Sequence, residues 1–158
     1  MRKAKVKEIY TASLILLIGT IYLAAQIDAI FSMGSTRVNG DTIQLSKNEV
    51  LSHLRSILTI ILCFSGGILL LKARRAGWII SLSVLLLLIT IASGIFVSNI
   101  TGLNFSAIVL MVGIFLLLLA TIFLLQSRAR EKFSVTRKTY LSVFILFMIL
   151  AMFYFVVK

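Results

Sequence analysis

Five long apolar stretches limit what this chain can fold into more than any other feature. They cover residues 9–31, 55–71, 77–98, 105–125 and 140–157. A bilayer core of about 30 Å is crossed by roughly 20 apolar helical residues, so each stretch meets or approaches the length needed to span it. The sequence therefore predicts an integral membrane protein with five transmembrane segments.

The composition excludes a water-soluble domain. Apolar residues make up 60% of the 158 residues and charged residues only 13%, whereas soluble domains carry about half apolar and a quarter charged residues. The apolar stretches lack the period-two alternation of barrel strands, and backbone groups in lipid must be hydrogen-bonded within their own segment. We therefore expect an all-α fold in which residues 1–158 form a single transmembrane domain, a bundle of five helices.

Positive charge is distributed unevenly between the two sides of the predicted bundle. Most of the 16 Lys and Arg residues precede the first stretch or lie in two connections, between the second and third stretches and between the fourth and fifth. Basic residues concentrate on the cytoplasmic side of membrane proteins. The N-terminus is therefore expected in the cytoplasm and the C-terminus outside, in a cell membrane such as the bacterial inner membrane.

Eight basic residues in these two connections are candidates for contact with anionic lipid headgroups, although topology alone would also explain them. They are Lys72, Arg74, Arg75, Arg128, Arg130, Lys132, Arg137 and Lys138. Trp78 and Tyr140 flank the connections, where interfacial aromatic anchors are expected. Nucleic-acid binding is not expected, because single-strand binding needs several stacking aromatics and the connection 126–139 contains only Phe133.

The predicted outside loop, residues 32–54, carries two local folding signals. Asn39-Gly40 separates two short strand-like runs, and this dipeptide favours the type I′ turn of a β-hairpin. Ser46 is followed three residues later by Glu49, the pattern of a capping box at a helix start. We expect a small β-hairpin in this loop and a second helix that begins near Lys47 and ends at residue 71.

Polar residues at membrane depth are few, and they gather near the outer side. The candidate ion pair or polar site consists of Gln26, Asp28, His53 and Arg55. Pairing of Asp28 with Arg55, or less favourably with His53, would relieve the burial of both groups. Gln26 is turned about 200° from Asp28 on a helix, so the two cannot serve one site. The site could hold a proton or cation, because imidazole titrates near neutral pH, or it could simply fix the first helix against the second.

Small residues predict where transmembrane helices approach each other closely. The candidate helix-packing residues are Ala25, Ala29, Gly66, Gly67, Gly77, Ser81, Thr90 and Gly94. The leucine runs 85–88 and 116–119, in contrast, place large apolar side chains on every side of their helices. These runs are typical of segments with extensive lipid contact.

No arrangement of residues in the sequence is typical of a catalytic, metal or cofactor site. Phosphate-binding, HExxH and GxSxG motifs are absent, His53 is the only histidine, and Cys63 is the only cysteine. We therefore expect no enzyme and no cofactor. The sequence fits a small non-catalytic accessory or interaction subunit, whose partner is another membrane protein or a second copy of the chain. The alternative is an oligomeric channel or small transporter with an outward-facing polar site near Asp28 and His53.

Overall fold

The computed structural model describes residues 6–35, 47–98 and 105–155, and the regular structure in these ranges is entirely helical. The helices are α1 (Val6–Ser35), α2 (Lys47–Leu71), α3 (Arg75–Ser98), α4 (Phe105–Leu125), α5 (Ser127–Lys132) and α6 (Arg137–Phe155). All of them except the short α5 are long and apolar enough to cross a membrane. The expected fold of five potential membrane-spanning helices is therefore confirmed.

The expectations for the loop after the first span have two different outcomes. Helix α2 begins at Lys47 and runs for 25 residues, so its predicted start and end are confirmed. The hairpin predicted around Asn39-Gly40 falls in residues 36–46, outside the described residues. It remains a prediction.

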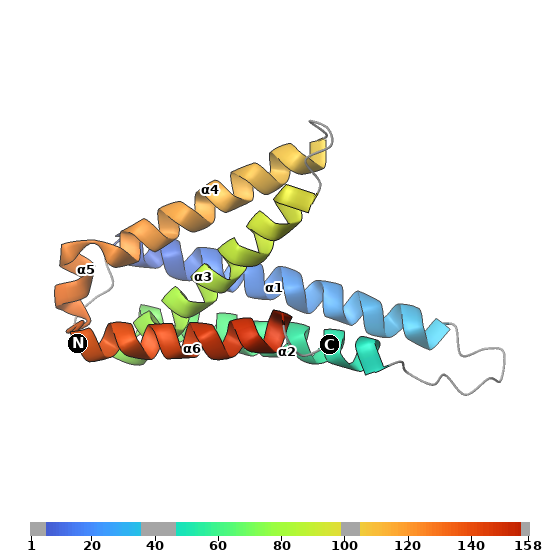
Figure 1. The fold of residues 1–158 in the computed structure, drawn as a ribbon, viewed down its shortest axis with the longest axis horizontal. Helices are drawn as coiled ribbons and strands as arrows, with labels where there is room; N and C mark the ends of the chain where they lie inside the picture. Colours follow the sequence, from blue (N-terminus) through green and yellow to red (C-terminus); the bar gives the residue numbers. More distant parts are fainter. Residues whose placement is uncertain (1–5, 36–46, 99–104, 156–158) are drawn as a thin grey trace.

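The long helices form two groups that diverge along the length of the molecule. Helices α1 and α2 pack along each other and α6 runs in a similar direction, while α3 and α4 lean away as an arm (Figure 1). Helix α3 joins the groups, because it packs on α2 and α6 as well as on α4. Its buried residues all lie between Gly77 and Leu88. Beyond Leu88 the helix is half-buried or exposed, and this is where the arm separates.

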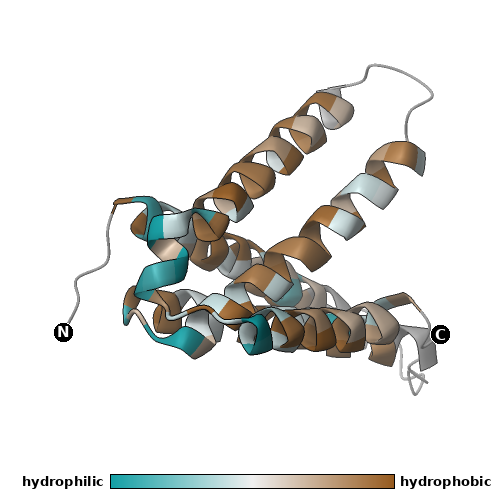
Figure 2. Cartoon of the chain, turned by 60° about the vertical axis from the view of Figure 1, so that its left-hand side comes forward, coloured by the Kyte–Doolittle hydropathy of each residue, from teal (hydrophilic) through white to brown (hydrophobic). Residues whose placement is uncertain are grey.

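Hydropathy distinguishes one end of the molecule from the rest. Hydrophilic residues gather around α5, at the end that also holds the start of α1 and the turn between α2 and α3 (Figure 2). We call this end the basic end and the opposite one the far end. Large apolar side chains such as Phe31, Phe115 and Met152 are exposed on the long helices. Such a surface suits helices that are surrounded by hydrocarbon rather than water.

Trp78 lies inside the protein at the basic end. It is fully buried, and its indole Nε1 donates a hydrogen bond to the backbone oxygen of Leu124 at 3.0 Å. Carbonyls in the last turn of a helix have no partner within that helix, so the end of α4 offers an acceptor at this depth. The expectation that Trp78 is an interfacial aromatic anchor is therefore wrong, because its side chain does not reach the protein surface. Tyr140, which meets the Trp78 ring edge-on at 5.6 Å, is exposed.

The turn between α2 and α3 is short because a non-glycine residue adopts a left-handed backbone conformation. Ala73 has φ of 50°. Its N–H donates to the Leu70 oxygen at 2.9 Å, and the Arg74 N–H donates to the Leu69 oxygen at 3.0 Å. These bonds form a Schellman motif, which satisfies the final carbonyls of α2. The chain reverses at once, so α3 packs directly on α2.

Candidate functional site

Polar side chains of α1, α2 and α6 meet in the half of the bundle toward the far end. The amide of Gln26 on α1 is hydrogen-bonded to the imidazole of His53 on α2. The Tyr154 hydroxyl on α6 donates to the backbone oxygen of Arg55 at 2.8 Å and is also hydrogen-bonded to the hydroxyl of Thr59. The Arg55 guanidinium lies 6.0 Å from the centroid of the Tyr154 ring, at the limit of a cation–π contact.

The predicted polar residues are therefore distributed over different contacts. Among the described residues, the structure gives no ion pair between Asp28 and Arg55; Asp28 is exposed, and Arg55 lies against Tyr154. His53 contacts Gln26 rather than Asp28. The geometry of α1 explains the difference. Gln26 and Asp28 project from nearly opposite sides of this helix, so Asp28 points away from α2 when Gln26 points toward it.

The polar stripe on α2 ends near the middle of the bundle. This stripe consists of Arg55, Thr59 and Cys63, which are spaced four residues apart and therefore share a face of α2. The next position on that face is Gly67, where an added Cβ would lie only 2.7 Å from Cγ of Leu16. Between this level and the basic end the helices enclose an apolar core, whose fully buried side chains include Ile15, Leu70, Trp78 and Leu85. A water-filled path through the monomer would have to cross this core.

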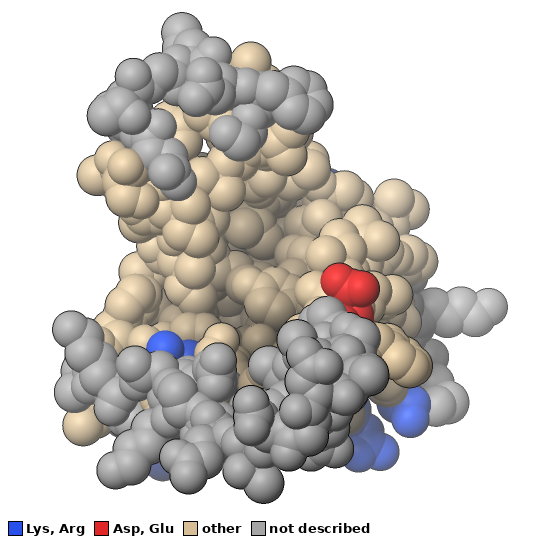
Figure 3. Space-filling view, turned by 90° about the vertical axis from the view of Figure 1, so that its right-hand side faces the viewer, with Lys and Arg blue, Asp and Glu red and all other residues tan. Residues whose placement is uncertain are grey.

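A lateral cleft of about 670 Å³ separates α1 from the arm formed by α3 and α4. Its three walls are formed by selected residues within 14–22 of α1, 88–95 of α3 and 109–117 of α4. The side chains that line the cleft are apolar apart from the hydroxyl of Tyr22. Seen from the far end, the surface is hollowed between the arm and the other helices, and an acidic side chain lies at the edge of the hollow (Figure 3).

Asp28 continues the face of α1 that lines this cleft. Leu14 and Ile21 lie in the wall, and Asp28 follows Ile21 after another seven residues, or about two helical turns. Its side chain is exposed. The cleft is therefore apolar along its length, with a carboxylate on the same helix face toward the far end.

The predicted packing residues divide between the two ends of the molecule. Four are buried toward the basic end: Gly66, Gly67, Gly77 and Ser81. The other four lie toward the far end: Ala25, Thr90 and Gly94 are exposed, and Ala29 is half-buried. A Cβ added at Gly94, or at Gly113 in the cleft wall, would meet no atom within 4 Å. Within the described residues, no neighbour packs closely against either glycine.

The basic end is held together by polar contacts across the connection between α4 and α6. Lys132 on α5 forms an ion pair with Glu8 on α1, with only 9% and 6% of the two side chains exposed. Lys7 donates to Oε1 of Gln126 at 2.9 Å. The connection read as a linker in the sequence is thus a short helix joined to the first turn of α1.

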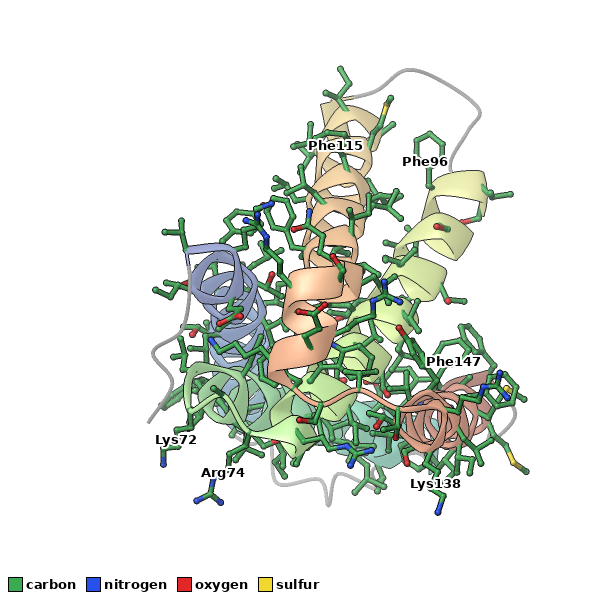
Figure 4. All side chains as sticks on the ribbon, turned by 90° about the vertical axis from the view of Figure 1, so that its left-hand side faces the viewer. Lys72, Arg74, Phe96, Phe115, Lys138 and Phe147 are labelled. Atoms are coloured by element: carbon green, nitrogen blue, oxygen red, sulfur yellow. The ribbon has the colours of Figure 1, made fainter. Side chains whose placement is uncertain are left out.

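The eight candidate lipid contacts have two different environments. Lys132 pairs with Glu8, and Arg75 donates through Nε to the Thr139 hydroxyl at 2.9 Å. Arg75 is nevertheless exposed, as are the other six: Lys72, Arg74, Arg128, Arg130, Arg137 and Lys138. Viewed along the bundle from the basic end, the labelled Lys72, Arg74 and Lys138 point outward, away from the helices (Figure 4).

Comparison of this chain with family models, with curated proteins and with solved structures finds no match. Its function must therefore be argued from its own residues. Within the described ranges, no group of three or more His, Cys, Asp or Glu side chains could hold a metal ion.

Three residues that organise the basic end were missed at the sequence level. Lys7, Glu8 and Gln126 lie at the edges of apolar stretches, where polar residues are ordinary and predict no particular partner. Glu8 did offer a signal, since it is the only acidic residue within a strongly basic N-terminal segment. Its partner Lys132 lies 124 residues later, a separation that helical periodicity cannot bridge.

Proposed function

We propose that this protein is a small non-catalytic membrane protein that acts as an accessory or interaction subunit. It would do so by receiving a transmembrane helix of another protein in the lateral cleft. The observation that carries the proposal is the cleft itself, an apolar space with walls from α1, α3 and α4. It has the chemistry of a helix contact within a membrane rather than that of an aqueous binding site.

The unused glycines of the far end support a helix as the occupant. Helix association in lipid depends on close packing at small residues, because hydrocarbon surrounds associated and separate helices alike. At the basic end, Gly67 and Gly77 already serve packing within the chain. A Cβ added at Gly113 in the cleft wall, or at Gly94 on the arm outside the cleft lining, would in contrast meet no atom of the described residues within 4 Å. Asp28 adds a charge preference, because its carboxylate would favour a partner helix that carries Lys or Arg at the matching level.

The polar stripe of α2 is the observation that favours the alternative, a channel or small transporter. Arg55, Thr59 and Tyr154 supply polar groups toward the far end, but buried apolar side chains such as Leu70 and Leu85 follow toward the basic end. An ion path needs polar groups or water along its whole length. This contrast supports the accessory role over conduction by one copy of the chain.

Replacing Gly113 with tryptophan should prevent partner binding without unfolding the protein. The indole would occupy the part of the cleft beside Gly113 where a partner helix would pack, and a Cβ at this position meets no atom within 4 Å. The measurement is native mass spectrometry of the protein extracted from its own membranes into lipid nanodiscs. Wild type should carry a stoichiometric membrane protein that Gly113→Trp loses. Met111→Trp should retain it, because Met111 is 63% exposed and does not line the cleft.

Two outcomes of this experiment would contradict the proposed function. A partner retained equally by wild type and Gly113→Trp would bind elsewhere on the molecule. If the wild-type protein carried only lipid, the cleft would be filled by acyl chains. A second copy of the chain, lost specifically in Gly113→Trp, would identify the partner helix as one of the protein's own.

We infer that the basic end faces the cytoplasm, which places the N-terminus inside and the C-terminus outside a cell membrane such as the bacterial inner membrane. The exposed cations near α5 support this orientation through the positive-inside rule. The predicted hairpin would then lie outside. Cysteines introduced at Gly40 and at Ser127, in a Cys63→Ser background, should react with an impermeant thiol reagent from opposite sides. Labelling of both positions from the outside would overturn this topology.

The exposed cations also support contact with anionic lipids at the basic end. Seven of the eight candidate residues are exposed there, and each Lys or Arg close to an anionic membrane surface strengthens association by about 1 kcal/mol. The lipid bilayer itself is therefore the second partner that we propose.

A further inference from the structure

A second pocket, of about 430 Å³, lies at the basic end between the first turn of α1 and the junction of α4 with α5. Its apolar wall includes Val6, Ile9 and Phe123, and its polar wall includes Lys7, Gln126 and Arg128. Phe123 belongs to the part of α4 that could cross a membrane. The pocket therefore extends from membrane depth to the level of the charged connection.

The net charge of this pocket is positive, although Glu8 also borders it. The Glu8 carboxylate is paired with Lys132 on α5, so its charge is balanced from outside the pocket lining. Lys7 and Arg128 then determine the charge that a ligand would meet. Both are exposed, so each can approach a ligand at the pocket rim.

Lys7 is oriented by two contacts within the pocket. Its ammonium nitrogen donates to Oε1 of Gln126 at 2.9 Å and lies 5.1 Å from the centroid of the Phe123 ring. An ammonium group has three N–H donors, so this bond leaves donors for a ligand, and the side-chain amide of Gln126 has two further N–H groups. A cation and neutral donors therefore converge beside an apolar wall.

We propose that this pocket is a binding site for one anionic phospholipid. Lys7, Arg128 and the Gln126 amide donate hydrogen bonds to the phosphate, and the first part of an acyl chain lies along Ile9 and Phe123. Phosphate suits these donors because a guanidinium can donate two parallel hydrogen bonds to its oxygens. The adjoining apolar wall favours a lipid over free phosphate. The basic end as a whole would attract anionic lipids, and this pocket would be the site there that binds a single lipid molecule. Its occupancy does not depend on a partner helix in the cleft.

A lipid at this position would contact α1, α4 and α5 at once, at the junction that Glu8 and Lys132 also hold. A ligand that binds only the folded protein raises its resistance to unfolding. Binding should therefore be visible both as a retained lipid and as a higher Tm.

The test compares full-length protein in detergent micelles that contain either phosphatidylglycerol or phosphatidylcholine. Native mass spectrometry should show wild type retaining phosphatidylglycerol preferentially. The double variant Lys7→Gln/Arg128→Gln should weaken this retention by about 30-fold, because each well-placed cation contributes about fivefold. The matched control Arg137→Gln/Lys138→Gln removes the same charge from exposed residues outside the pocket. These residues contribute only to the general attraction for anionic headgroups, so the control should weaken retention far less than Lys7→Gln/Arg128→Gln does.

Each alternative result would overturn the site. An equal loss in both double variants would indicate a diffuse charge effect, and unchanged retention in Lys7→Gln/Arg128→Gln would exclude the pocket. A rise in Tm with inorganic phosphate equal to that with phosphatidylglycerol would make it a free-anion site. Gly113→Trp should retain the lipid normally, so failure of the cleft proposal and failure of this one are separate observations.

Discussion

Replacing Lys132 with methionine should lower the free energy of unfolding by about 3 to 5 kcal/mol, because the variant keeps the buried Glu8 carboxylate but loses its ion pair with Lys132. Both side chains are almost completely buried in the folded protein. Desolvation of a carboxylate is tolerated when a close cation compensates it, and it becomes costly when the cation is removed. The contact also joins α5 to α1, so its loss should loosen the basic end.

The single cysteine of the chain provides the measurement. Cys63 is fully buried, so a thiol-reactive fluorophore should label it only as the protein unfolds in detergent. The Tm of Lys132→Met should fall by roughly 6 to 20 °C, at about 2 to 4 °C per kcal/mol for a chain of this size. Lys138→Met removes an exposed lysine from the same end and should change the Tm by no more than about 2 °C.

A double variant distinguishes the loss of the ion pair from the loss of lysine packing. Adding Glu8→Gln to Lys132→Met removes the buried carboxylate that has lost its ion pair with Lys132, so the double variant should be more stable than Lys132→Met alone. If the two changes instead added their separate costs, the residues would not be coupled. If Lys132→Met behaved like Lys138→Met, the pair would contribute nothing measurable to stability.

The membrane-spanning helices could be predicted from the sequence because the bilayer fixes their length and composition. The stretch predicted at 105–125 corresponds to α4 (Phe105–Leu125), and the one predicted at 77–98 ends with α3 at Ser98. The start of α2 was also predictable, since a capping pattern acts within one helical turn. Each of these features depends on residues that are close together in the sequence.

Contacts between helices could not be predicted in the same way. Helix α4 is apolar on all sides, so its sequence does not reveal which face meets α1 or α3. Tyr154 contacts Arg55, which lies 99 residues earlier, and no periodic pattern identifies such a partner. Trp78 was assigned to the lipid interface because its neighbours in the sequence are basic, whereas the acceptor that draws it inward belongs to Leu124 on another helix.

The candidate sites depend on the same long-range geometry. The cleft exists because the arm of α3 and α4 diverges from α1, and the divergence follows from the end of close packing at Leu88. The run of four leucines at 85–88 does not mark that boundary in the sequence. The expectation of extensive lipid contact for this run is wrong, because Leu85, Leu87 and Leu88 are buried. Asp28 and His53 were recognised as rare polar groups at membrane depth, but their separate environments became clear only from the positions of α2 and α6.

Gly77→Ala should be the second strongly destabilising change. It should lower the free energy of unfolding by about 3 kcal/mol or more. A Cβ at this position would lie 2.7 Å from the backbone oxygen of Leu69 and closer still to backbone atoms of Leu69 and Leu70. Backbone atoms within α2 cannot move aside as a flexible side chain can, so the two helices would have to separate. The same Cys63 labelling assay should show a fall in Tm of roughly 6 to 12 °C or more.

Gly94→Ala is the matched control, because it makes the same change in the same helix. A Cβ at Gly94 meets no atom within 4 Å, and alanine is favoured over glycine inside a helix by roughly 0.5 to 1 kcal/mol. This variant should therefore be slightly more stable than wild type. Equal losses in both variants would contradict the close approach of α2 and α3 at Gly77. A lower Tm for Gly77→Ala together with a slightly higher Tm for Gly94→Ala would mean that α3 is tightly packed at the basic end and loosely packed at the far end. This asymmetry leaves the cleft accessible to a partner.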